Sequence, residues 1–287
     1  MSPRFTEWRQ PLPLGETSLN VATIGRTGLR APVVFLHGFG STKEDYADFV
    51  HHPEFDDRPF LAWDAPGCGA TTIDDPARID LPLLVATAMK MIDSRGFTRF
   101  HLVGHSMGGL TGLLLAHLQP ERVLSFTSIE GNLAPEDCFL SRQVHEHPAE
   151  GDEAFFAAFI ERTRQGRDLS STLYASSLRH KVRTEAVRPI FRSMVTCSDE
   201  GALLDKFLGL PCPVHFMYGE QNAHLSYLGK LAQEGARLTS IPHCGHFPMY
   251  SNPVLMWWAL ADFFNESERV QRSEEHTSEL QSHSGIS

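Results

Sequence analysis

The hydrophobic positions along this chain alternate between two kinds of pattern. Short apolar runs rich in β-branched and aromatic residues predict buried strands at residues 31–36, 60–63, 99–103, 123–129, 213–218 and 237–241. Stretches with apolar residues at helical spacing occur at residues 81–95, 110–118, 224–234 and 254–264. A looser alternation near the N-terminus predicts one more strand at residues 17–25, paired with residues 5–10. Strands that alternate with helices are typical of a parallel sheet covered on both faces.

The middle of the chain departs from that alternation. Residues 134–206 carry more charge, contain no strand-like run, and show helical periodicity at residues 154–160 and 184–195. We therefore predict a helical region inserted into an α/β core. The core itself is then formed by residues 1–133 and 207–271.

A hexapeptide between a predicted strand and a predicted helix is the strongest sign of chemistry. Residues 104–109 read GHSMGG, which contains the pattern G-x-S-x-G. In that setting the pattern forms a sharp turn that lifts a serine hydroxyl off the sheet, and its glycines make room for neighbouring backbone. We therefore predict that Ser106 is a nucleophile and that the N–H of Met107, at a helix N-terminus, points to a developing oxyanion. The alternative is a glycine-rich turn without chemistry.

Four short motifs, in this order, give the chain a resemblance to a known family. They read HGFG at residues 37–40, DAPGCG at 64–69, GHSMGG at 104–109 and GHFP at 245–248. The chain resembles the α/β-hydrolases with a helical cap, over residues 17 to about 265. The resemblance implies a mostly parallel eight-stranded sheet flanked by helices, with residues 134–206 as the cap. It also implies that the N–H of Phe39 is the second donor of an oxyanion hole.

A serine hydroxyl is a weak nucleophile and needs an adjacent base. His246 follows the last predicted strand, which is the place of the histidine in the hydrolase order of serine, acid and histidine. His243 and His105 have weaker claims, since the resemblance implies a structural histidine beside the serine. We expect His37 to order the glycine loop through hydrogen bonds.

The acid is where the sequence departs from the usual family pattern. The family places an aspartate in the turn after the seventh strand, and this turn reads Gly219-Glu220-Gln221-Asn222. An asparagine that replaces the acid of a serine protease costs roughly 10⁴ in rate. Some family members carry the acid after the sixth strand, where Glu130 stands here. We predict Glu130 as the acid, with Glu220 as the alternative, and we expect Asn222 to contribute little.

Two further groups of residues have a structural and a functional interpretation. Asp64 ends a strand beside glycines, and the resemblance implies that it shapes a loop. A mostly apolar substrate pocket is typical of small-molecule enzymes, and we expect four aromatic residues to line it: Phe139, Phe159, Tyr174 and Phe247. Alternatively, such aromatic residues only dock the cap onto the sheet.

The net charge and the cysteines limit the partners and the cellular compartment that we expect for the protein. A formal net charge of −10 argues against nucleic acid or an anionic membrane as a partner. No apolar run approaches the roughly 18 residues of a membrane span, and no secretory signal is visible at the N-terminus. The five cysteines are scattered, without a C-x-x-C pair or metal-ligand spacing, which predicts reduced thiols in a cytoplasmic protein. We expect neither a metal nor a cofactor.

The last sixteen residues have a separate interpretation. Residues 272–283 read RSEEHTSELQSH, which looks like the in-frame translation of a common short-read sequencing adapter. We therefore predict that residues 272–287 derive from environmental or library sequencing reads and are disordered, and we exclude them from reasoning about the fold. The alternative is an ordinary polar tail.

These observations together predict a serine hydrolase that cleaves small, moderately apolar carboxylic esters through an acyl-enzyme. The same catalytic residues also serve C–C bond hydrolysis of β-diketones, lactone opening and perhydrolysis, and the fold does not decide among them. Ser106 excludes the aspartate nucleophile of dehalogenases and epoxide hydrolases. The alternative from another class is a non-catalytic ligand-binding protein with a hydrolase fold, which Asn222 favours.

Overall fold

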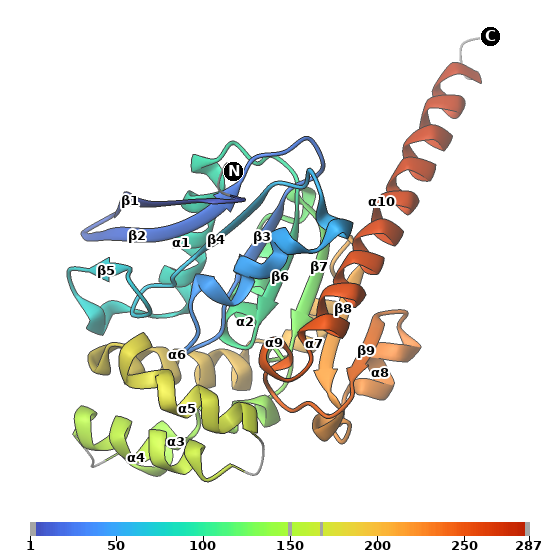
Figure 1. The fold of residues 1–287 in the computed structure, drawn as a ribbon. Coiled ribbons are helices and arrows are strands. Elements are labelled where there is room, and N and C mark those ends of the chain that lie inside the picture. The colour runs from blue at the N-terminus through green and yellow to red at the C-terminus, as the bar shows by residue number, and fades with distance from the viewer. Residues whose placement is uncertain (1–3, 149–150, 167–168, 285–287) are drawn as a thin grey trace.

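A nine-stranded, mostly parallel sheet organises the computed structural model, which describes residues 4–148, 151–166 and 169–284 (Figure 1). The strands are β1 (Thr6–Leu14), β2 (Thr17–Arg26), β3 (Val33–Leu36), β4 (Phe60–Trp63), β5 (Thr72–Ile73), β6 (Phe100–His105), β7 (Val123–Ile129), β8 (Val214–Gly219) and β9 (Arg237–Ile241). Their spatial order is β1-β2-β4-β3-β6-β7-β8-β9, and the two-residue β5 pairs with β2. The pairs from β4 through β9 are parallel, whereas β1, β2 and β4 pair antiparallel.

The predicted α/β architecture is confirmed, and its buried strands explain the apolar runs. Every residue of β3, β4, β6 and β7 is buried, because helices cover both faces of the parallel part of the sheet. The expected pairing of the two N-terminal strands is also present, with Thr6 opposite Gly25 and Leu14 opposite Thr17. The sheet differs from the expected eight strands only by β5, which is too short to leave a periodic signal.

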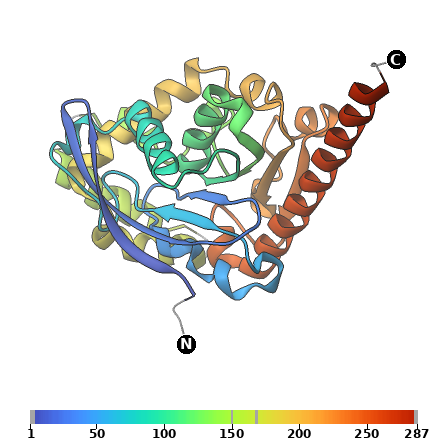
Figure 2. The same ribbon diagram turned by 90° about the horizontal axis from the view of Figure 1, so that it is seen from above.

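The helices of the core lie on both faces of the sheet (Figure 2). They are α1 (Leu81–Ser94), α2 (Met107–Leu118), α8 (Leu228–Gln233), α9 (Pro248–Ser251) and α10 (Pro253–Ser284). Short 3₁₀ segments add η1 (Lys43–His51), η2 (Pro53–Phe55), η3 (Pro76–Arg78), η4 (Pro120–Arg122), η5 (Pro135–Cys138) and η6 (Glu220–Asn222). α1 and α2 pack together on one face, while η1 and the first part of α10 lie on the other.

Between β7 and β8, helices cross the edge of the sheet where these strands end (Figure 1). Four of them form this layer: α3 (Gln143–Glu146), α4 (Asp152–Arg164), α5 (Leu169–Lys181) and α6 (Thr184–Glu200). The last helix of the segment, α7 (Leu203–Leu208), packs against α2 instead, and its Phe207 ring lies 5.8 Å from that of Phe126 in β7. In the described part of this segment the only β-type pairing is a single bridge from Val182 to Cys68. The first four helices form a layer over the ends of the strands, which is the arrangement expected of a cap.

The C-terminal segment differs from the expected disorder. α10 begins at Pro253 and its backbone stays helical to Ser284, while residues 285–287 lie outside the described part. The stretch from residue 272 contains no glycine or proline before Gly285, so it has none of the residues that break a helix most strongly. In both views this end of α10 projects away from the body of the protein. Among the described residues, no helix combines the length and apolar character needed to cross a membrane.

Candidate active site

Ser106 stands at a strained turn between β6 and α2. Its backbone has φ 52° and ψ −119°, a left-handed conformation that costs free energy in a residue with a side chain. The turn closes only because its neighbours lack side chains: a Cβ on Gly104 would lie 2.2 Å from the carbonyl oxygen of Gly108. A Cβ on Gly108 would lie 2.1 Å from the carbonyl oxygen of Leu36. This local packing holds the hydroxyl above the end of the strand.

His246 lies on the loop after β9 and faces the serine. Its Nε2 is 2.9 Å from Oγ of Ser106, a good hydrogen-bond distance. The loop is fixed from behind by His105, whose Nε2 is 2.7 Å from the carbonyl oxygen of His246. Burial and the neighbouring His246 lower the pKa of His105 well below its usual value. A neutral His105 therefore donates its Nε2–H to that carbonyl and supports the site from within the core.

Glu130 follows β7 and lies on the other side of the His246 ring. Its Oε2 is 3.4 Å from Nδ1 of His246, longer than an ideal hydrogen bond, and its side chain is 4% exposed. The backbone N–H of Gly219 donates to Oε1 at 2.6 Å, and Nδ2 of Asn222 donates to Oε2 at 2.8 Å. Neutral donors thus hold the carboxylate in place and leave its charge facing the imidazole.

The turn after β8 therefore has a different role from the one expected from sequence. Asn222 supports Glu130 directly, a contact that was not predicted from the sequence. The sequence feature that could have indicated it is the amide at the position of the family aspartate. The alternative acid Glu220 is exposed and accepts the N–H of His243 at 2.9 Å. Glu220 and His243 thus pair with each other, and among the described residues neither forms a hydrogen bond or ion pair with Ser106 or His246.

The loop that carries Phe39 lies directly against the nucleophile. A Cβ on Gly38 would be 3.1 Å from the Cβ of Ser106. His37 braces this loop: its Nδ1 lies 2.7 Å from the carbonyl oxygen of Gly38, and its Nε2 accepts the N–H of Ala65 at 2.8 Å. On the opposite side, Met107 is the first residue of α2, so its N–H has no partner within the helix. The two amides predicted to bind an oxyanion thus belong to segments that flank Ser106.

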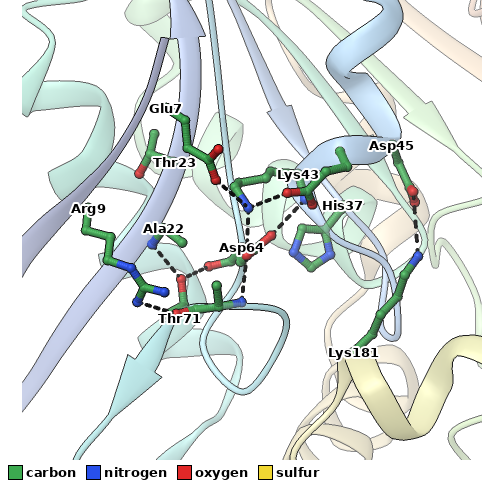
Figure 3. A network of polar contacts seen from close by, with 12 residues as sticks. Glu7, Arg9, Ala22, Thr23, His37, Lys43, Asp45, Asp64, Thr71 and Lys181 are labelled. Carbon is green, nitrogen blue, oxygen red and sulfur yellow. Dashed lines mark hydrogen bonds and ion pairs between the residues drawn. The ribbon is translucent and has the colours of Figure 1, made fainter.

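A buried ion pair anchors the same loop to the next strand (Figure 3). Lys43 and Asp64 are 3% and 1% exposed, and Nζ of Lys43 lies 3.2 Å from Oδ2 of Asp64. Asp64 also accepts the N–H of Lys43 at 2.8 Å and the N–H of Ala70 at 2.8 Å. Burial acts to lower the pKa of Lys43, but the carboxylates of Glu44 and Asp64 outweigh it and raise that pKa. These contacts fit the structural role expected for Asp64.

A pocket opens above Ser106 and His246 between the core and the cap. It encloses about 370 Å³ of empty space, including its open mouth. Its lining consists of Phe39, Ser106, Asn132, Asp137, Phe139, Leu140, Ser141, Tyr174, Phe191, Met194, His246 and Phe247. The lining therefore includes three of the four aromatic residues expected there.

The fourth expected aromatic residue, Phe159, is not part of the lining. It is fully buried one layer behind the pocket, with its ring 6.2 Å from that of Phe39 and 5.3 Å from that of Phe191. Phe139 is instead 53% exposed at the mouth, and its ring meets the His246 ring edge-on at 5.2 Å. The polar lining residues Asn132, Asp137 and Ser141 were not anticipated, because they follow β7 without a recognisable motif.

The described residues contain no group of three His, Cys, Asp or Glu side chains placed to bind a metal ion. Their five cysteines form no disulfide. What the site offers is a hydroxyl, an imidazole and a carboxylate in sequence, beneath a mostly apolar pocket.

A comparison with protein-family models matches residues 33–256 to the alpha/beta hydrolase family. This chain belongs to the α/β hydrolase family. Solved structures agree with that fold: a carboxylesterase of the thaumarchaeon Nitrososphaera gargenis has a TM-score of 0.73, covering 91% of this hydrolase and 99% of that chain at 14% identity. The N-acyl homoserine lactonase AidH has a TM-score of 0.70, with 91% and 98% coverage at 18% identity.

Curated relatives match parts of this hydrolase. A dihydrolipoyllysine-residue acetyltransferase component of the acetoin cleaving system from Pseudomonas putida is 37% identical over 34% of the chain. The putative carbamate hydrolase RutD from Pseudomonas savastanoi pv. phaseolicola is 31% identical over 39% of the chain. These matches span only 26% and 45% of the two relatives' own lengths. The monoacylglycerol lipase abhd6-A of Xenopus laevis is 22% identical over 88% of the chain and 80% of its own length.

Proposed function

We propose that this α/β hydrolase is a serine hydrolase that cleaves small carboxylic esters through an acyl-enzyme intermediate. The observation that carries the proposal is the continuous contact from Ser106 to His246 to Glu130, at 2.9 Å and 3.4 Å. A nucleophile hydrogen-bonded to a base, with that base oriented by a third group, is the arrangement that activates a serine.

In the first half of the reaction, Oγ of Ser106 attacks the ester carbonyl carbon while Nε2 of His246 takes the hydroxyl proton. The carbonyl oxygen becomes an oxyanion, which the N–H groups of Phe39 and Met107 bind. The tetrahedral intermediate then collapses with cleavage of the ester C–O bond. His246 passes its proton to the departing alkoxide, and the alcohol leaves.

In the second half, a water molecule attacks the acyl-enzyme and His246 takes its proton. Collapse of the second tetrahedral intermediate returns the proton to Ser106 and releases the carboxylic acid. Throughout, Glu130 keeps Nδ1 of His246 protonated and stabilises the imidazolium that forms in each half-reaction. The residues that hold Glu130, Asn222 among them, keep it in that position.

The same residues open a lactone, which is a cyclic ester, and lactone hydrolysis is the second candidate function. Solved structures similar to this chain include AidH and the enol-lactonase of Burkholderia xenovorans, the latter with a TM-score of 0.68 at 18% identity. A non-catalytic binding protein loses its main support, because Asn222 accompanies the carboxylate Glu130 and does not replace it.

Labelling with a fluorophosphonate probe and a p-nitrophenyl ester series test the proposal together. We expect the wild-type protein to bind the probe covalently and to hydrolyse short-chain esters fastest, because the pocket is small. Ser106→Ala should abolish both labelling and turnover while the melting temperature stays the same. A protein that neither reacts with the probe nor hydrolyses any ester or lactone would overturn the assignment.

A further inference from the structure

The segment that leads from the core into the cap contributes polar groups to an otherwise apolar pocket. Residues 132–141 follow Glu130 and Gly131, and three of them line the pocket with polar side chains: Asn132, Asp137 and Ser141. Most of the remaining wall is aromatic or aliphatic. A small-molecule site of this kind uses a few placed polar groups to fix the orientation of its ligand.

Ser141 is the member of this group that lacks a partner. It is 3% exposed, and its hydroxyl forms no hydrogen bond within the described part of the protein. A buried hydroxyl without a partner is costly, and native structures rarely keep one unless water or a ligand completes it. Because Ser141 lines the pocket beside Ser106 and His246, a bound substrate can supply that partner.

Asn132 is held so that one half of its amide stays available. It is 3% exposed, and its Nδ2 donates to Oγ of Ser198 at 3.1 Å and to Sγ of Cys138 at 3.3 Å. Both contacts use the NH₂ group, which leaves the carbonyl oxygen as an acceptor. Asn132 and Ser141 therefore offer the pocket one fixed acceptor and one rotatable hydroxyl.

Asp137 differs from these two because its carboxylate is already satisfied. It accepts the N–H groups of Leu133 and Ala134 at 2.7 Å and 2.8 Å, and the hydroxyl of Tyr227 at 2.8 Å. Burial outweighs these donors and raises the pKa of Asp137 to about 6. Asp137 therefore braces the start of the cap segment, and the groups open to a ligand are those of Asn132 and Ser141.

We propose that Asn132 and Ser141 select substrates that carry a hydroxyl group near the scissile ester or lactone bond. A hydroxyl both donates and accepts, so it can donate to the Asn132 carbonyl and accept from the Ser141 hydroxyl. A purely apolar substituent would leave both buried groups unpaired, which is the situation in which a site discriminates strongly against an analogue. This inference rests on the proposed esterase function and names its substrate class.

Matched pairs of esters test the inference. One pair places the hydroxyl on the acid, p-nitrophenyl 3-hydroxybutyrate against p-nitrophenyl butyrate, and the other on the alcohol, 2-hydroxyethyl butyrate against propyl butyrate. We expect wild-type kcat/KM to favour the hydroxylated member of at least one pair about tenfold. Ser141→Ala should reduce that preference severalfold.

Ser128→Ala is the matched control. Ser128 is also buried with a hydroxyl that lacks a partner in the described part, but it does not line the pocket. We expect Ser128→Ala to keep the wild-type preference, and Ser141→Cys to lie between wild type and Ser141→Ala. Ser141→Ala should not lower the melting temperature, since no intramolecular hydrogen bond is lost.

Three results would overturn the inference: no preference in either wild-type pair, an unchanged preference in Ser141→Ala, or a clear loss of thermal stability in Ser141→Ala. Each of these results is distinct from failure of the proposed function. If the proposed function were wrong, wild-type protein would not hydrolyse the plain esters p-nitrophenyl butyrate and propyl butyrate at all.

Discussion

Two loops in this protein follow buried strands and carry a buried carboxylate at nearly the same position. Asp64 comes directly after β4 and Glu130 directly after β7, and the whole residues are 1% and 6% exposed. Both stand at the edge of the sheet where the site lies, and both are followed within a few residues by glycine. The sequence analysis gives Asp64 a structural role and makes Glu130 the predicted acid, and their surroundings differ in the same sense.

The Asp64 loop neutralises its charge internally. The ammonium of Lys43 lies 3.2 Å from the carboxylate, and the N–H groups of Lys43 and Ala70 occupy the remaining lone pairs. The same ammonium also pairs with the exposed carboxylates of Glu44 at 2.5 Å and Glu7 at 3.6 Å, so Asp64 belongs to a cluster of charges centred on Lys43. The contacts of Asp64 join the loop after β3 to the loop after β4, so its charge is used to hold backbone.

The Glu130 loop leaves its charge uncompensated. No lysine or arginine in the described part forms an ion pair with Glu130; its donors are a backbone N–H, the Asn222 amide and the His246 ring. At an effective dielectric constant of about 20, unit charges at the 3.4 Å separation of Glu130 and His246 attract by roughly 5 kcal/mol. That attraction arises only when His246 is protonated, which is the state that the proposed reaction forms. The proposed catalytic acid therefore differs from Asp64 in that no lysine or arginine of the described part pairs with it.

The largest expected effect comes from removing the charge of Glu130. Glu130→Gln keeps the shape of the side chain but loses the attraction to the imidazolium and favours the wrong ring tautomer. We expect kcat to fall by roughly 10³–10⁴, as in the corresponding change in a serine protease. The measurement is steady-state hydrolysis of the best p-nitrophenyl ester, with circular dichroism to confirm the fold. Near-normal turnover in Glu130→Gln would remove the distinction between the two loops.

The second effect falls on stability and concerns the Lys43–Asp64 pair. Asp64→Asn removes the one buried carboxylate of the three around the Lys43 ammonium, while the exposed Glu44 and Glu7 remain. We expect the loss of this charged contact to cost about 1.5–3 kcal/mol in the free energy of unfolding. Lys43→Met together with Asp64→Asn should recover part of that loss, because both members of the buried pair are then neutral. Urea unfolding of wild type and the two variants measures this. If Asp64→Asn abolished turnover and left the unfolding curve unchanged, Asp64 would act in the chemistry.

The fold could be predicted closely because its buried strands leave an unambiguous trace. Runs such as Phe60–Trp63 are apolar throughout, as a strand covered on both faces requires. β5 could not be predicted, since two residues carry no period. The helical backbone after residue 272 was not predicted, because these residues resemble a translated adapter and seven of residues 272–284 are Ser, Thr or His, which are weaker helix formers.

The candidate site was partly predictable because the side chains proposed to react follow strands. Ser106, Glu130 and His246 each stand just after β6, β7 or β9, and parallel strands bring such positions to one edge. The supporting residues depend on packing between distant segments, which no local pattern encodes. The contact from Asn222 to Glu130 joins residues 92 positions apart, and the layer in which Phe159 lies depends on how the cap docks.

The third effect concerns the amide that holds Glu130. Asn222→Ala removes the 2.8 Å donor to Oε2, the same oxygen that faces His246. A hydrogen bond to a charged group contributes about 1.5–3 kcal/mol, and Gly219 still holds the other oxygen. We therefore expect a loss of roughly tenfold in kcat, with little change in KM, where each factor of ten corresponds to about 1.4 kcal/mol. This replaces the expectation from sequence that Asn222 contributes little.

Glu220→Ala on the same turn is the control for Asn222→Ala. Its carboxylate is exposed and contacts the His243 N–H, so turnover should stay within about twofold of wild type. If Glu220→Ala were the more damaging variant, the acid would have to be assigned to the turn after β8.

The smallest expected effect is on how the free energy of unfolding depends on pH. Burial lowers the pKa of His37 despite the nearby charge of Asp64, and its Nε2 accepts the Ala65 N–H only when unprotonated. A histidine whose folded-state pKa is lowered contributes stability above its unfolded value of about 6.5 and loses it as pH falls toward the folded value. We expect His37→Gln to make the free energy of unfolding less steep between pH 6.5 and 5 than in wild type, by at most about 1.4 kcal/mol per pH unit.

The exposed His117 gives the matched control, since His117→Gln should leave the slope of stability against pH unchanged. Equal slopes in wild type, His37→Gln and His117→Gln would mean that folding does not lower the pKa of His37. The Ala65 contact would then not brace the loop that carries Phe39. A reduced slope in His37→Gln alone would show that the Asp64 loop responds to acid through folding. The role proposed for the Glu130 loop has a separate test, because it affects the turnover of protein that is still folded.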